Sequence, residues 1–84
     1  MYKRITAVTP IPDYKLLVTF EDSETRLLNM EPYLVKGIYK ELKDISLFNS
    51  AHVSFDTIEW SNQADIDPEF VYSESIPYDI KDAM

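Results

Sequence analysis

The sequence predicts a small, single-domain α+β fold built on an antiparallel sheet of about five strands. The expected order is three strands, a helical stretch, two strands and a short helix. Strand patterns that come in runs, instead of alternating with helices, indicate antiparallel pairing. A chain of 84 residues with an apolar fraction of 45% has room for one domain with a hydrophobic core.

The clearest strand signal lies in residues 14–20. Side chains there alternate with a period of two, which is typical of a strand with one buried face. The residues expected on the buried face are Tyr14, Leu16, Val18 and Phe20. An earlier strand is predicted over residues 2–9. It should stop at Pro10-Ile11-Pro12-Asp13, because proline cannot continue a central strand.

A third strand over residues 25–30 completes a β-hairpin with a turn at Asp22-Ser23. A two-residue type I′ turn would force a positive φ on Ser23. A longer loop built on a type I turn is therefore favoured.

Residues 29–48 are predicted to form short helical pieces. Asn29 can cap a helix that begins at Met30, with Pro32 in its first turn. Gly37 stands where a helix end needs a positive φ. Tyr33, Leu34 and Val35 are expected to face the core. The spacing of Ile38, Tyr39 and Leu42 indicates a second helical turn, and Ile45, Leu47 and Phe48 indicate a further, half-buried turn.

Two short strands and a helix follow. The strands are marked by Val53 with Phe55 and by Ile58 with Trp60, joined at Asp56-Thr57. A capping Asp67 before Pro68 and Glu69 marks the helix start, and its apolar residues are Phe70, Val71 and Tyr72. We expect the compact domain to cover residues 1–72, and the polar residues 73–84 to form a frayed tail.

The amino-acid composition argues against several classes of function. The net charge of −7 repels phosphates, so direct binding of nucleic acid is not expected. The sequence has no cysteine, which excludes disulfides and thiolate metal sites and fits a reducing interior. It shows neither a signal peptide nor an apolar run long enough for a membrane span. A cytoplasmic protein without membrane contact is expected.

No catalytic residue, metal site or cofactor site is predicted. The one histidine, His52, has no cysteine to pair with and is read as an ordinary strand residue. The carboxylates of Asp65, Asp67 and Glu69 lack the glycine of a calcium loop and are explained by helix capping. Trp60 fits a core position or a stacking aromatic at the sheet rim. The candidate interaction or pocket-rim residues are Trp60, Tyr33, Tyr39 and Tyr72.

An ordered series of motifs spans roughly residues 4–72. Its members are Val8; Tyr14, Leu16, Val18 and Phe20; Asp22-Ser23-Glu24; Asn29-Met30; Leu42, Asp44 and Phe48; Ile58-Glu59-Trp60; and Asp65 to Tyr72. The series resembles the bacterial family called domain of unknown function 2442. In this chain Ser23 and Gln63 stand where the family pattern has glycines, and Asn29 where it has a capping Asp.

The resemblance implies a compact α+β domain without an established enzyme activity, and it carries over no catalytic residues. It also implies a place beside short genes suspected to encode toxin–antitoxin partners. We therefore expect a non-enzymatic protein-interaction module, an antitoxin-like or regulatory partner of a small and basic protein encoded nearby. The alternative is a small-ligand sensor with a pocket rimmed by Trp60 and tyrosines. A large exposed patch rich in aromatic residues would favour the first function, and a deep closed pocket with a few inward polar groups the second.

Overall fold

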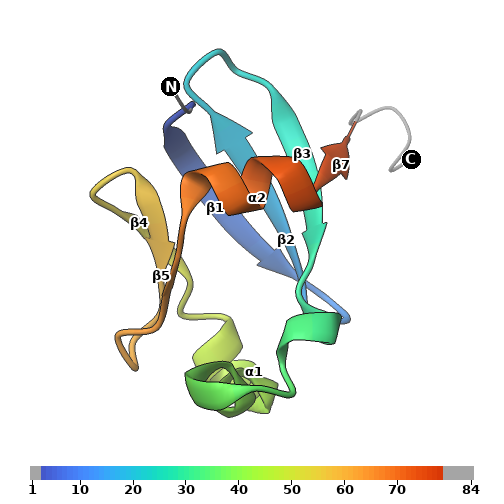
Figure 1. Cartoon of the computed structure of the whole chain (residues 1–84), viewed down its shortest axis with the longest axis vertical. Coiled ribbons are helices and arrows are strands. Elements are labelled where there is room, and N and C mark those ends of the chain that lie inside the picture. Colours follow the sequence, from blue (N-terminus) through green and yellow to red (C-terminus); the bar gives the residue numbers. More distant parts are fainter. Residues whose placement is uncertain (1–2, 79–84) are drawn as a thin grey trace.

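The computed structural model describes residues 3–78, which form two antiparallel sheets and several short helices (Figure 1). Its elements are β1 (Ile5–Ile11), β2 (Lys15–Phe20), β3 (Thr25–Asn29), the 3-10 helices η1 (Glu31–Tyr33) and η2 (Gly37–Lys43), α1 (Ile45–Phe48), β4 (His52–Ser54), β5 (Thr57–Glu59), β6 (Asp65–Ile66), α2 (Pro68–Glu74) and β7 (Ile76–Pro77). The α+β class and the antiparallel pairing are confirmed. The single sheet of about five strands is replaced by a four-stranded sheet, β1-β2-β3-β7, and a three-stranded sheet, β4-β5-β6.

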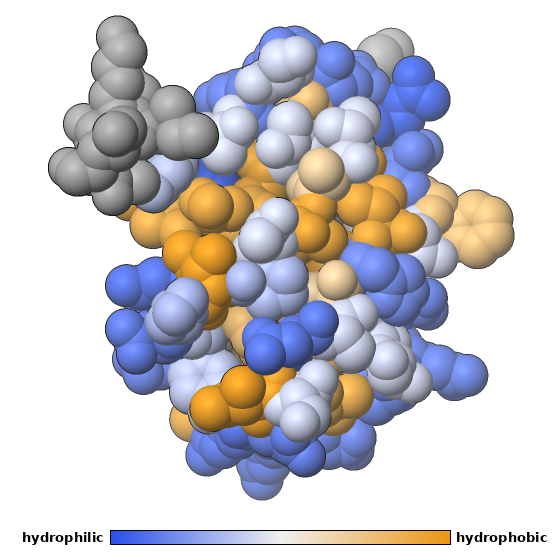
Figure 2. Space-filling model, turned by 180° about the vertical axis from the view of Figure 1, so that it is seen from behind, coloured by the Kyte–Doolittle hydropathy of each residue, from blue (hydrophilic) through white to orange (hydrophobic). Residues whose placement is uncertain are grey.

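The four-stranded sheet is covered on one face by α2 (Figure 1). The predicted alternation in β2 is confirmed, since Leu16, Val18 and Phe20 are fully buried on this side. The other face carries a cross-strand row in which Leu17 pairs with Leu27 and Leu27 with Ile76. Figure 2, seen from behind, shows hydrophobic residues in a band across this uncovered side of the molecule. The sheet therefore has one buried and one solvent-facing side.

β1 does not stop at Pro10, as the sequence predicted. It continues through Pro10, paired with Leu16, to Ile11, paired with Lys15. The reason is that β1 is at the end of the sheet order, where a proline need not donate to a further strand.

Two loops share a backbone conformation. The Ser23 N–H donates to the Phe20 carbonyl, and the Gln63 N–H donates to the Trp60 carbonyl at 2.9 Å. The third loop residue has a positive φ in both cases, 69° at Ser23 and 72° at Gln63. The longer loop expected after β2 is confirmed, yet the positive φ still falls on Ser23. These are the two positions where the resemblance calls for glycine, and the backbone conformation explains that preference.

The helical stretch begins one residue later than predicted. Asn29 belongs to β3 and Met30 holds the N-cap position of η1, so the predicted capping role of Asn29 is wrong; its Oδ1 accepts the Glu31 N–H at 3.1 Å in a turn that leads into η1. Gly37 has the expected positive φ, but it opens η2 instead of closing a helix. Leu34 is buried as expected, and Leu42 and Phe48 are buried as well. The expectations that Val35 faces the core and that Ile45 is half-buried are wrong, because both side chains are exposed.

The C-terminal helix starts as predicted, since Asp67 Oδ1 accepts the Glu69 N–H at 2.7 Å. The expected boundary at residue 72 is wrong. α2 continues to Glu74, Ser75 is buried, and β7 pairs with β3. The domain thus extends through residue 78, and the part of the expected tail over 79–84 lies outside the described residues.

Both sheets contribute to one hydrophobic core. Trp60, the residue directly after β5, is 1% exposed, and its Nε1–H donates to the Phe48 carbonyl at 3.1 Å. The smaller sheet also contacts β1, where the Ile5 N–H donates to the Asp56 carbonyl at 3.3 Å. This contact anchors the β4–β5 hairpin to the start of the larger sheet.

Candidate interaction site

A groove with aromatic walls runs between the 3-10 helices and the β6–α2 segment. We call it the aromatic groove. It encloses about 670 Å³ and is lined by Pro32, Tyr33, Lys36, Tyr39, Asp65, Ile66, Asp67 and Phe70. Its walls come from segments about thirty residues apart in the sequence, so the groove exists only in the folded chain.

Hydrogen bonds fix both tyrosine rings of the groove. The Tyr39 hydroxyl donates to the Asp65 carbonyl at 2.6 Å. The Tyr33 hydroxyl donates to Glu74 Oε1 at 3.1 Å, and its ring meets Phe70 edge-on with 5.2 Å between centroids. Burial raises the pKa of both tyrosines, helped by the charge of Glu74 at Tyr33 and of Asp65 at Tyr39. Both hydroxyls therefore stay protonated near neutral pH, and the rings are held in place.

The charges of the groove lining come from Asp65, Asp67 and Lys36. Asp67 uses Oδ1 for the helix cap, which leaves its second oxygen for another donor. Within residues 3–78, neither the Asp65 carboxylate nor the Lys36 ammonium has a hydrogen-bonding or ion-pair partner. The groove thus combines apolar walls with carboxylates that can still accept hydrogen bonds.

A second exposed feature is the tip of the β4–β5 hairpin. Ser54 pairs with Thr57, so the loop consists of Phe55 and Asp56 alone. Both have a positive φ, 50° and 70°, which defines a type I′ turn. Phe55 is 97% exposed. The prediction that Phe55 lies on a strand is wrong. The strand ends at Ser54, and the apparent alternation of Val53 and Phe55 extends beyond it into the turn.

Phe55 is the residue that the sequence reasoning missed. Type I′ turns favour Asn-Gly, since both central residues need a positive φ. A bulky aromatic in this conformation is an outlier, and it costs about 1–2 kcal/mol. The sequence predicted the turn at Asp56-Thr57. Placing it one residue earlier, at Phe55-Asp56, would have shown that Phe55 lies at an exposed hairpin tip.

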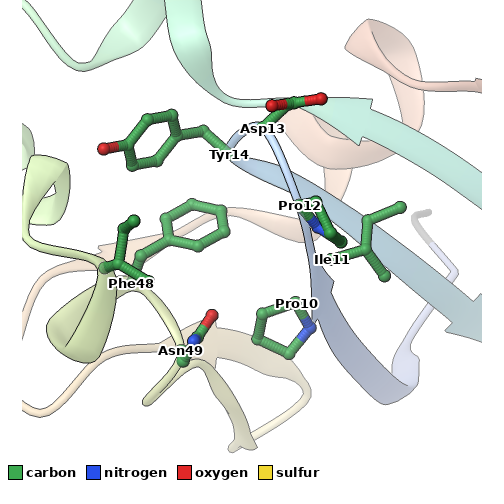
Figure 3. Close-up of a pocket in the computed structure, with 8 residues that line it drawn as sticks. Pro10, Ile11, Pro12, Asp13, Tyr14, Phe48 and Asn49 are labelled. Atoms are coloured by element: carbon green, nitrogen blue, oxygen red, sulfur yellow. The ribbon is translucent and has the colours of Figure 1, made fainter.

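A smaller pocket of about 420 Å³ lies between the β1–β2 loop and α1 (Figure 3). The rings of Tyr14 and Phe48 form one wall, at a centroid distance of 5.4 Å, and Pro10 and Pro12 contribute to the other side. The Tyr14 hydroxyl is engaged by the Lys43 carbonyl at 2.6 Å. The remaining polar side chains of the lining are those of Asp13 and Asn49.

The structure separates the four aromatic residues singled out from the sequence. Tyr33 and Tyr39 line the aromatic groove together. Trp60 is in the core, which confirms that alternative and removes Trp60 from any rim. Tyr72 lies elsewhere, packed beneath two cations, with Lys3 Nζ 4.8 Å and the Arg26 guanidinium carbon 4.2 Å from its ring centroid.

Tyr72 belongs to a network that ties the N-terminal segment, the β2–β3 loop and α2 together. Its hydroxyl donates to Glu24 at 2.9 Å, Arg26 bridges to Glu24 at 2.8 Å, and Lys3 reaches both Asp22 and Glu24. Arg26, Tyr72 and Lys3 together lower the pKa of Glu24. Because its members satisfy one another, we assign the network a structural role.

In the described part of the chain, no three His, Cys, Asp or Glu side chains gather as metal ligands would. His52 is a strand residue, as predicted, and its Nε2 lies 3.4 Å from Glu59 Oε1 on the neighbouring strand. Over the same residues, every helix is too short or too polar to span a membrane.

These features define a small antiparallel α+β domain with an aromatic groove and an exposed aromatic hairpin tip. The family described as Protein of unknown function (DUF2442) matches residues 5–77, and the chain belongs to it. Comparisons with the curated proteins and with the solved structures gave no match.

Proposed function

We propose that the domain is a non-enzymatic interaction module that docks on another protein in the cytoplasm. Its partner is a small basic protein encoded nearby, towards which the domain acts as an antitoxin-like or regulatory subunit. The observation that carries this proposal is the exposed, conformationally costly Phe55 at the β4–β5 tip.

Phe55 does nothing for the stability of its own domain. Burying a phenylalanine side chain stabilises a fold by about 1.5–3 kcal/mol. That gain is lost at 97% exposure, and the positive φ adds a cost. Costly backbone conformations are found at binding sites, where the strain serves recognition. A protruding aromatic side chain is also the type of residue that anchors protein–protein contacts.

The acidic charge of the domain indicates a partner with a basic surface. The net charge of −7 accelerates encounter with a basic surface, and the association rate falls as salt rises. Asp56 and Glu59 place carboxylates on the same hairpin as Phe55. A partner with an apolar pocket and a basic rim would match this tip.

The test is co-purification of the tagged domain with the proteins encoded beside it, at low and at high salt. Wild-type protein should retain a basic neighbour at low salt, and Phe55→Ala should lose it. Val35→Ala is the matched control, since it also removes an exposed apolar side chain (56% exposed) and lies outside both pockets described above. Circular dichroism should show both variants folded. Equal capture by Phe55→Ala and wild type would refute Phe55 as the anchor.

The pocket between the β1–β2 loop and α1 favours the alternative, a small-ligand sensor. A sensor would respond to metabolites with a higher melting temperature and would not retain its neighbours. If nothing associates at low salt while a metabolite raises the melting temperature, the sensor replaces the interaction module.

A further inference from the structure

We propose that the aromatic groove binds the side chain of an arginine carried by an extended segment of the partner protein. This inference deepens the proposed function, and it rests on that function in taking the ligand to be a protein. It concerns a different surface from the hairpin tip, so the two can be tested separately.

The walls of the groove suit a flat cation. Tyr33, Tyr39 and Phe70 present rings that their own contacts hold in place. A guanidinium stacks favourably on such rings through the negative charge of the ring face. The aliphatic stem of an arginine would pack on Pro32 and Ile66, with its charged end at the carboxylates.

The carboxylates supply the acceptors. Asp65 is without a side-chain partner in the described residues, and the second oxygen of Asp67 is not used by the helix cap. A guanidinium presents five N–H donors in a plane, and charge-assisted bonds to carboxylates are stronger than neutral ones.

The protein already contains the arrangement that the groove would complete. Arg26 lies 4.2 Å from the Tyr72 ring centroid and donates to the Glu24 carboxylate at 2.8 Å. In that cluster a guanidinium lies over a ring face and pairs with a carboxylate, while its other N–H groups donate to Ser75. The aromatic groove offers rings and carboxylates of the same kind without the arginine.

Replacement of Lys36 distinguishes a cationic ligand from an anionic one by the sign of the change in affinity. Lys36 is the one cation in the groove lining, and no anion within residues 3–78 pairs with it. Its charge opposes an incoming guanidinium. Replacing Lys36 with Met, which keeps the length of the stem, should therefore strengthen binding, whereas a ligand held by an anion would lose affinity.

The probe is a blocked pentapeptide with a central arginine, Ac-Gly-Ala-Arg-Ala-Gly-NH2, titrated into ¹⁵N-labelled protein. Its control carries citrulline, which has the same shape and no charge. The arginine peptide should shift the amide signals of Tyr39, Asp65 and Phe70, and citrulline should bind roughly fivefold more weakly. Asp65→Asn should weaken the arginine peptide, as should Asp67→Asn, which keeps a good cap. Lys36→Met should bind it more tightly.

The outcomes separate the two proposals. Equal binding of the arginine and citrulline peptides, or weaker binding by Lys36→Met, overturns the arginine site while leaving the groove as a docking surface. No shift of the groove signals, together with Phe55-dependent capture of a neighbour, also overturns it but keeps the proposed function. Groove binding with no neighbour captured supports the arginine site and removes the hairpin tip from the proposed function.

Discussion

Replacing the turn Phe55-Asp56 by Asn-Gly should stabilise the domain and at the same time abolish docking. Both residues have a positive φ, which residues other than glycine, asparagine and aspartate adopt with difficulty, so the strain falls mainly on Phe55. Asn-Gly is the sequence that this turn type prefers. The Asp56 carbonyl, which accepts the Ile5 N–H, is a backbone group and is kept in the variant.

The magnitude follows from strain and burial. The ring of Phe55 is 97% exposed, so its removal costs almost no packing. Relief of the strain at Phe55, less the extra chain entropy of glycine, leaves a gain of about 1 kcal/mol. In a domain of this size each kcal/mol raises the melting temperature by about 4–8 °C. Phe55→Ala, which keeps the strained turn, should change stability by less than about 0.5 kcal/mol.

Thermal and urea unfolding of the wild type, the Asn-Gly variant and Phe55→Ala measure the change in stability. Co-purification with the basic neighbour measures docking. The expected combination is a more stable Asn-Gly variant that no longer retains the neighbour. A lower melting temperature for Asn-Gly, or a loss above about 1 kcal/mol for Phe55→Ala, would show that the ring packs within the domain and would refute the reasoning.

Further predictions follow from other sites. Ser23→Gly and Gln63→Gly should each stabilise the domain by about 0.5–1 kcal/mol, and an unchanged urea midpoint would contradict the strain assigned there. Trp60→Phe should cost about 1–3 kcal/mol in urea unfolding, because the Phe48 carbonyl loses the indole donor and keeps the Ala51 N–H; a neutral effect would mean that the indole bond adds no stability. Glu24 has a pKa below its usual 4.5, so its contribution is present above pH 4.5 and is lost as pH falls through the lowered value. Melting curves from about pH 2 to 7 should show the deficit of Glu24→Gln disappearing in acid, and a deficit that persists there would rule the charge out as its cause.

The parts of the fold that could be predicted are those whose signal is local. The buried face of β2 follows from alternation around Val18, and the start of α2 follows from Asp67 beside Pro68. Each pattern has its physical cause within a few residues. The two-residue strands β6 and β7 have no such pattern. They are strands only because folding brings Ile66 beside Ile58 and Ile76 beside Leu27.

The candidate site residues also differ in how far the sequence alone could place them. Tyr33 and Tyr39 were singled out as candidate interaction or pocket-rim aromatics, and both line the groove. Phe70 was assigned to the apolar face of its helix, because nothing in its own segment indicates that Tyr33 meets its ring. Trp60 was left between core and rim, and the hydrogen bond to the Phe48 carbonyl, from another element, decides for the core. The type of a residue suggests several roles, and the contacts it makes with distant segments determine which role applies.

With a single glycine, this chain places several other residues at positive φ in its described part: Asp13, Tyr14, Ser23, Phe55, Asp56 and Gln63. Two of them are aromatic, and they differ in what offsets the cost. Tyr14 packs edge-on against Phe48 and donates to the Lys43 carbonyl, so its strain is offset inside the domain. Phe55 carries the same kind of strain at 97% exposure. No contact of this kind offsets the strain of Phe55 within the described residues, and under the proposed function a partner that buries the ring would supply the compensation.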